Sequence, residues 1–144
     1  MRTVLLDASV LVAGMVDQLR QHGRALDGWI RERDGGAVLC CTSHAVAECY
    51  ATLTALPLAR PVQPVEAREL MRVNVLQGLK VLSLNQRDYE KALDRVVGMG
   101  LRSGVVYDAL HLVRAERERC DVLLTFNLRD FTRLEPEGVE VIAP

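Results

Sequence analysis

Five short apolar runs constrain the fold of this chain more than any other feature of its sequence. Each run is four or five residues long and lacks the alternation of apolar and polar residues that marks a strand with one wet face. Short continuous runs of this kind are typical of strands buried on both faces of a parallel sheet. The expected strands are Thr3–Leu6, Ala37–Cys41, Val81–Leu84, Val122–Thr125 and Val139–Ile142.

Helical patterns fill the gaps between these runs. Ser43 and Asn85 are suitable N-cap residues, and Pro64 suits the first turn of a helix. The expected helices are His22–Arg33, Ser43–Leu56, Pro64–Leu79, Asn85–Met99 and Val105–Arg119. Strands that alternate with helices predict an α/β fold, with a mainly parallel sheet of about five strands between two layers of helices.

The chain of 144 residues is of ordinary size for one domain, so we expect a single domain over residues 1–144. Ala59–Gln63, with prolines around it, is the one obvious loop; it is either a plain connection or a mobile flap beside a groove.

Charge and hydropathy argue against several classes of protein. The chain has 18 basic and 19 acidic residues, so it is not a protein that grips long nucleic acid by charge alone. Its apolar runs are well short of the roughly 20 residues that a membrane span needs. The N-terminal residues resemble a strand rather than a signal peptide, so we expect a cytoplasmic protein.

The four cysteines, Cys40, Cys41, Cys49 and Cys120, include no Cys-x-x-Cys pair. Cys40 and Cys41 are neighbours in an expected strand and should therefore point to opposite faces of the sheet. Zinc binding by Cys41, His44 and Cys49 is conceivable, but burial as small apolar side chains is the commoner role for such thiols.

Three acids stand alone in uncharged segments. Asp7 is the only charged residue from Thr3 to Val16, and Glu48 is the only one from Ala37 to Ala59. Asp108 is likewise the only one from Ser103 to Val113, if His111 is neutral. Because an ionised carboxylate in an apolar interior is costly unless it is paired or bound to metal, these acids are candidates for a shared metal site.

Alternatives exist for each acid. All three could form separate buried salt bridges with residues distant in sequence, and Asp7 could cap the helix that begins near Ser9. Asp7 follows a strand, however, and ligand sites of open α/β sheets gather at the carboxyl ends of strands. Asn127 and Asp130 follow another expected strand, where Asn127 is a candidate site residue or merely a helix cap.

At these residues the sequence resembles PIN domains, and specifically the VapC-type toxins of toxin–antitoxin pairs. The resemblance covers nearly the whole chain. It rests on motifs around the three acids, on their order and on one later segment. The motifs are Leu6-Asp7-Ala8-Ser9, Ala47-Glu48, Tyr107-Asp108-Ala109-Leu110-His111 and Leu124-Thr125-Phe126-Asn127-Leu128-Arg129-Asp130-Phe131.

The resemblance implies cleavage of RNA that depends on Mg²⁺ or Mn²⁺, with structured RNA such as tRNA or rRNA cut at a loop. It carries over Asp7, Glu48, Asp108 and Asn127 as catalytic and metal-binding residues, and Ser9, Thr125 and Asp130 as supporting residues. It further implies a homodimer and inhibition by a VapB-type antitoxin. Asn127 occupies a position where family members have Asp or Asn, so a second metal would bind weakly or only with substrate.

Competing interpretations fit less well. A phosphotransfer domain of the haloacid-dehalogenase type needs a second acid two residues after Asp7, where this chain has Ser9, and a receiver domain needs an acid pair and a late lysine. A housekeeping RNA-processing nuclease and a PIN-like module that binds without cleaving both remain as alternatives. We expect His111, one helical turn from Asp108, to pack or form hydrogen bonds rather than act as a general base.

Overall fold

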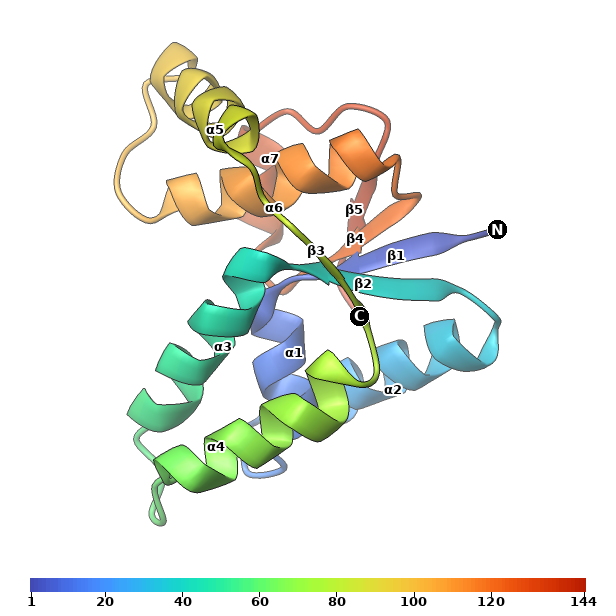
Figure 1. Ribbon diagram of the computed structural model, residues 1–144, viewed down its shortest axis with the longest axis vertical. Helices are drawn as coiled ribbons and strands as arrows, with labels where there is room; N and C mark the ends of the chain where they lie inside the picture. The colour runs from blue at the N-terminus through green and yellow to red at the C-terminus, as the bar shows by residue number, and fades with distance from the viewer.

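The structure is a computed structural model that describes residues 1–144, and a five-stranded parallel sheet lies at its centre (Figure 1). The strands run in the order β3-β2-β1-β4-β5, and every neighbouring pair is parallel. Their bounds are β1 Thr3–Leu6, β2 Val38–Thr42, β3 Lys80–Leu82, β4 Val122–Leu124 and β5 Glu140–Ile142. The predicted sheet is thus confirmed, with strand ends shifted by one or two residues.

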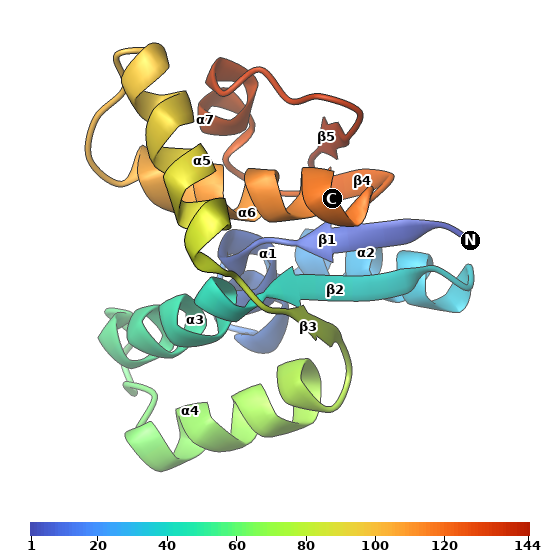
Figure 2. The same cartoon turned by 45° about the horizontal axis from the view of Figure 1, so that its top comes forward.

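Helices cover both faces of the sheet (Figure 2). Their bounds are α1 Ala8–Met15, α2 His22–Asp34, α3 Ser43–Ala55, α4 Pro64–Met71, α5 Gln86–Gly98, α6 Val105–Glu118 and α7 Leu128–Arg133. Alternate residues of a strand face opposite layers: Val4 and Leu6 pack with α1 to α4, whereas Leu5 packs with α5 to α7. This confirms the predicted three-layer α/β/α arrangement.

The cysteines are buried, as expected for small apolar side chains. Cys41 and Cys49 belong to the core on the α1 side, and Cys40 and Cys120 belong to the core on the α6 side. The prediction that Cys40 and Cys41 face opposite sides of the sheet is therefore confirmed. No three His, Cys, Asp or Glu side chains lie close enough together to form a zinc site.

Two local predictions were wrong. The helix expected over Pro64–Leu79 is α-helical only to Met71 and continues as a π-helical turn over Arg72–Leu76. The Asn74 amide donates to the Leu70 carbonyl at 2.9 Å, so a side chain competes there for an acceptor of the regular helix. The N-cap of α3 is Thr42 rather than Ser43, because β2 runs into the helix without a loop and the Thr42 Oγ1 accepts from the Ala45 N–H.

Candidate active site

The candidate site lies at the carboxyl ends of the central strands. From β1 the chain moves to β2 on one side, and it later returns to place β4 on the other side of β1. The order of the strands therefore reverses at β1, and the crevice at such a reversal is the usual ligand site of open α/β sheets. Asp7 directly follows β1, and Thr125 directly follows β4.

Asp7 is held by hydrogen bonds to both carboxylate oxygens. Its Oδ1 accepts from the Ser9 hydroxyl at 2.6 Å and from the Val10 N–H at 3.2 Å, and its Oδ2 accepts from the Thr125 hydroxyl at 2.6 Å. Asp7 is also the N-cap of α1, so the capping role coexists with a place in the site. Burial, which leaves Asp7 2% exposed, raises the pKa of this carboxyl, whereas the bonds from Ser9 and Thr125 act to lower it.

Ser9 and Thr125 also tie the ends of the two strands together. The Ser9 Oγ accepts from the Phe126 N–H at 3.0 Å, and the Thr125 Oγ1 accepts from the Asn127 N–H at 2.8 Å. The two hydroxyls that orient Asp7 thus also fix the backbone that carries Asn127. Asn127 is exposed, and although it occupies the N-cap position of α7, its side chain makes no capping hydrogen bond.

Asp108 lies in the first turn of α6, where the helix dipole favours an acid. Its half-buried carboxylate has no hydrogen-bond or ion-pair partner in the protein. Burial raises the pKa of Asp108 to about 7; the charge of His111 lowers it, whereas those of Asp7, Asp130 and Glu48 add to the rise. Asp7, Asp130 and Glu48 are therefore near enough to repel an ionised Asp108.

Glu48, on α3, is paired with two histidines rather than with a lysine or arginine. The His111 Nε2 lies 3.0 Å from the Glu48 Oε2, and the His44 Nε2 lies 3.4 Å from the same oxygen. Burial acts to raise the pKa of Glu48, but the hydrogen bond and charge of His111 and the charge of His44 hold it below its usual range. The alternative of separate salt bridges to Lys or Arg does not hold for Asp7, Glu48 or Asp108.

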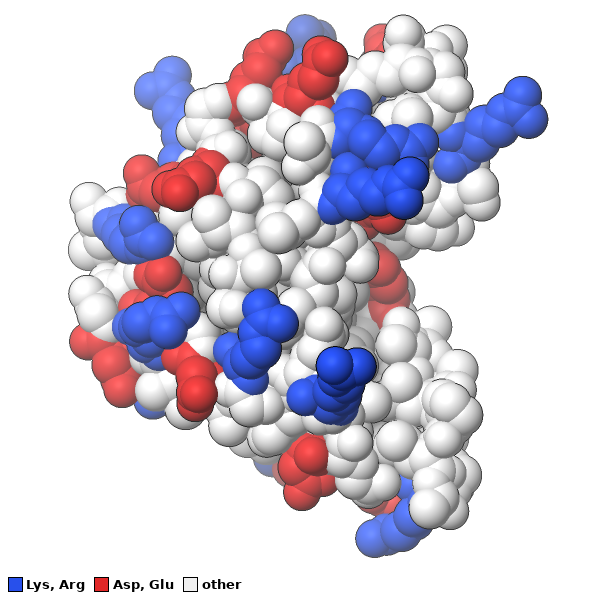
Figure 3. All heavy atoms as spheres, turned by 180° about the vertical axis from the view of Figure 1, so that it is seen from behind, with Lys and Arg blue, Asp and Glu red and all other residues white.

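A cleft of about 480 Å³ opens beside these residues. Ser9, Glu48, Thr52 and Asn127 line it, together with Arg20 from the segment that joins α1 to α2. On the face opposite to Figure 1, acidic side chains lie at the base of a notch between two lobes, and basic side chains border the notch (Figure 3). Sequence reasoning missed Arg20, because nothing in the segment around it signals proximity to the acids.

The acids do not form a ready-made set of metal ligands around this cleft. Asp7 and Asp108 are not among the residues that line the cleft, and no three acidic, histidine or cysteine side chains meet closely enough to hold an ion as they stand. Like charges repel, and Glu48 is drawn toward His111 and His44. The shared metal site expected for the three acids stays a prediction: Glu48 lines the cleft, whereas Asp7 and Asp108 do not.

The donor set nevertheless fits a hard divalent cation. Mg²⁺ and Mn²⁺ prefer oxygen ligands, and Asp7, Glu48, Asp108 and Asn127 offer carboxylate and amide oxygens. No lysine or arginine neutralises Asp7 or Asp108, so a cation would relieve the repulsion that raises the pKa of Asp108.

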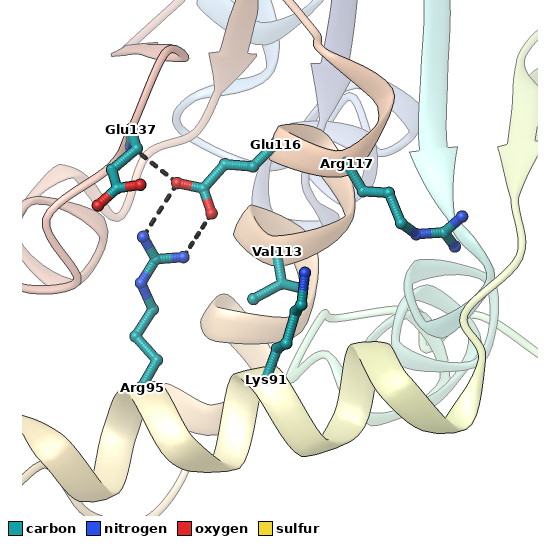
Figure 4. A pocket seen from close by; sticks show the side chains of 6 residues that line it. All are labelled: Lys91, Arg95, Val113, Glu116, Arg117 and Glu137. Atoms are coloured by element: carbon teal, nitrogen blue, oxygen red, sulfur yellow. Dashed lines mark hydrogen bonds and ion pairs between the residues drawn. The ribbon is translucent and has the colours of Figure 1, made fainter.

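A second hollow of similar volume lies between α5 and α6, away from the acids (Figure 4). Its charges are already matched: Arg95 pairs with Glu116, whose Oε2 also accepts from the Glu137 N–H at 2.8 Å. Arg117 pairs with Asp88 outside the hollow. The Arg95–Glu116 pair ties α5 to α6, and the one unpaired carboxylate in the hollow, that of Glu137, is exposed to solvent.

Comparisons with known proteins agree with this geometry. Residues 4–135 match the family model described as the PIN domain. One relative, Ribonuclease VapC27 of Mycobacterium tuberculosis, is 29% identical over 136 residues, which cover 94% of this chain and 93% of that protein.

Solved structures share the fold at low identity. VapC20 of Mycobacterium tuberculosis, described as a sarcin-ricin loop cleaving toxin, has a TM-score of 0.76 at 16% identity, over 94% of this chain and 98% of its own. VapBC2 from Rickettsia felis, solved with a DNA fragment from its promoter, has a TM-score of 0.72 at 14% identity, over 98% of both chains.

Proposed function

Because this chain belongs to the PIN-domain family, we propose that it is a metal-dependent endoribonuclease that acts as a VapC-type toxin. Asp108 is the observation that carries the proposal. A half-buried carboxyl with a pKa of about 7, three acids nearby and no partner in the protein is a costly arrangement for stability alone. Such an arrangement is expected where a cation binds.

In this proposal Asp7, Glu48, Asp108 and Asn127 hold Mg²⁺ or Mn²⁺. The ion, when bound, supplies a more acidic water and neutralises charge on the phosphate under attack. Ser9 and Thr125 keep both oxygens of Asp7 oriented through bonds of 2.6 Å each. Asn127 adds an oxygen ligand without a further negative charge, and Asp130 contributes to the acidic field around Asp108.

The proposed substrate is structured RNA, such as tRNA or rRNA, cut at a loop to leave 5′-phosphate and 3′-hydroxyl ends. A loop can bend its backbone into a small cleft more readily than a duplex can. An acidic site repels phosphates, so RNA also needs basic contacts at its border. Arg20 lines the cleft and has no carboxylate partner, and so its guanidinium is available for a phosphate.

The proposed partners are a VapB-type antitoxin and a second copy of the chain. Support comes from structures of similar fold, which include VapBC-1 from Haemophilus influenzae and a toxin–antitoxin complex from Klebsiella pneumoniae. In this proposal the antitoxin inhibits the nuclease by covering the acidic site.

Cleavage of cellular RNA by the purified protein tests the nuclease. We expect cleavage with Mg²⁺ or Mn²⁺, none in excess chelator, and a loss of about 100-fold or more in rate for Asp108→Asn, because the negative charge of a metal ligand is removed. Asp94→Asn is the matched control: Asp94 is an exposed acid on α5 that has no partner, and this variant should cleave at the wild-type rate.

Three results would count against the proposal. Cleavage that persists in chelator would contradict the metal dependence, and equal cleavage by Asp108→Asn and wild type would contradict the proposed site. Metal-dependent binding of RNA without cleavage would favour a binding module instead.

Expression in cells tests the toxin role. Expression of the wild-type chain should arrest growth, and expression of Asp108→Asn should not. A housekeeping nuclease would leave growth unchanged in both strains.

A further inference from the structure

A hydrogen-bonded chain of three side chains ends on Glu48. The Thr42 Oγ1 lies 2.8 Å from the His111 Nδ1, and the His111 Nε2 lies 3.0 Å from the Glu48 Oε2. The residues come from three elements: Thr42 ends β2, Glu48 lies on α3, and His111 lies on α6. Thr42 is fully buried and His111 is 1% exposed, so the chain of contacts is shielded from solvent until it reaches Glu48.

Because the ionised Glu48 carboxylate can only accept, His111 donates to it, and the partners of Thr42 agree with this direction. The Thr42 Oγ1 already accepts from the Ala45 N–H at 3.1 Å as the N-cap of α3. Its own hydroxyl proton is then free to be donated to the His111 Nδ1. A neutral ring that accepts at Nδ1 carries its proton on Nε2, and that N–H points at Glu48.

We propose that His111 is a positioning residue that holds the Glu48 carboxylate in its orientation beside the cleft, with the imidazole itself oriented by Thr42. Glu48 Oε2 is occupied by the histidines, whereas Oε1 has no hydrogen bond within the protein and is left for a ligand. The inference rests on the proposed function, since it assigns to Glu48 a metal that the site would bind. Loss of a group that orients a metal ligand typically weakens metal binding by about 10- to 100-fold.

The surroundings of His111 argue against a direct chemical role. A ring that is 1% exposed, with both nitrogens engaged, has no route to a water in the cleft. His44 contributes less to the orientation of Glu48, because its Nε2 is 3.4 Å away and its ring stacks on Tyr107 at a centroid distance of 5.0 Å. His111 is thus the better-placed of the two donors.

Two measurements on tag-free protein test the inference. Without metal, a ¹H–¹⁵N NMR spectrum above pH 8 should show the His111 ring protonated at Nε2; a proton on Nδ1 instead would overturn the proposed direction of the bonds. With Mn²⁺, the free-ion EPR signal gives the dissociation constant. We expect His111→Leu, which removes both bonds, to weaken Mn²⁺ binding by about 10- to 100-fold.

Two further variants separate positioning from a general loss of structure. His111→Gln keeps an N–H donor within reach of Glu48 and should recover most of the affinity. Val96→Ala truncates a buried α5 side chain in the core on the α6 side of the sheet and should lower stability without weakening Mn²⁺ binding. Equal affinities for wild type and His111→Leu, equal losses in His111→Leu and Val96→Ala, or no recovery in His111→Gln would overturn the role of His111. Absence of Mn²⁺ binding by the wild type would instead contradict the proposed function.

Discussion

Burial raises the pKa of Asp108, in the candidate site, to about 7, and this affects the stability of the fold. Burial is the main cause of the rise from the ordinary value of 3.8 for an aspartate carboxyl. A carboxyl whose pKa is higher in the folded state contributes stability below its unfolded pKa and loses it as pH rises through the folded pKa. The ionised Asp108 of the metal-free protein therefore opposes folding above about pH 7.

Asp108→Asn should remove this penalty. At pH 8 without metal, we expect the variant to be more stable than the wild type by about 1 to 2 kcal/mol, a figure reduced for solvent screening of a half-buried group. Near pH 4 the difference should vanish, because the wild-type carboxyl is then protonated. Urea denaturation at both pH values measures the difference in the free energy of unfolding between variant and wild type. A variant that is less stable than the wild type at pH 8 would contradict the electrostatic account of Asp108.

At the scale of elements, helix α6 connects the site to the rest of one layer. It carries Asp108 and His111 in its first half and Arg117 in its last turn. Arg117 donates through Nε and Nη2 to the two oxygens of Asp88, each at 2.8 Å, and so ties α6 to the start of α5. Asp88 also completes the capping box of α5 with Asn85, and its side chain is 1% exposed.

Asp88→Asn should loosen this connection. We expect a loss of about 2 to 3 kcal/mol in the free energy of unfolding at pH 7, because the buried end of a charged pair is removed. Burial acts to raise the pKa of Asp88, but the bonds from Arg117 and Asn85 hold it below its usual range, so the contribution exists above about pH 4 and fades at lower pH. Asp34→Asn, at a side chain 64% exposed and paired with Arg33, should cost less than about 0.5 kcal/mol.

The elements also show why sequence predicted some parts of the site and not others. Lone acids in apolar segments identified Asp7, Glu48 and Asp108, because missing charge is visible along the chain. The pairing of Glu48 with His111 joins residues 63 positions apart, and it arises only when α3 and α6 meet over the sheet. The π-helical turn coincides with a hydrogen bond from the Asn74 amide to the Leu70 carbonyl, which periodicity does not reveal. No helix of the structure has the length and apolar character to cross a membrane.

The candidate ligands are spread over the whole chain, so metal binding and folding should be coupled across the molecule. Asp7 follows β1, Glu48 lies on α3, Asp108 lies on α6, and Asn127 precedes α7. An unfolded chain does not bring these groups together, so an ion held by them would bind the folded state selectively. At a free Mn²⁺ concentration 100 times the dissociation constant, such binding stabilises the fold by about 2.7 kcal/mol. For a protein of this size, that corresponds to a rise of roughly 5 to 10 °C in Tm.

Thermal denaturation with increasing Mn²⁺ measures this coupling. The wild type should show a Tm that climbs with the logarithm of the Mn²⁺ concentration once the site is saturated, and chelator should reverse the rise. Asp108→Asn should begin from a higher Tm at pH 8 and gain little from Mn²⁺, because it lacks both the repulsion and the negative charge of the ligand. Asp94→Asn should follow the wild-type curve. A similar gain in Tm for wild type and Asp108→Asn would place the bound ion elsewhere on the surface. The grouping of Asp7, Glu48 and Asp108 would then need another explanation.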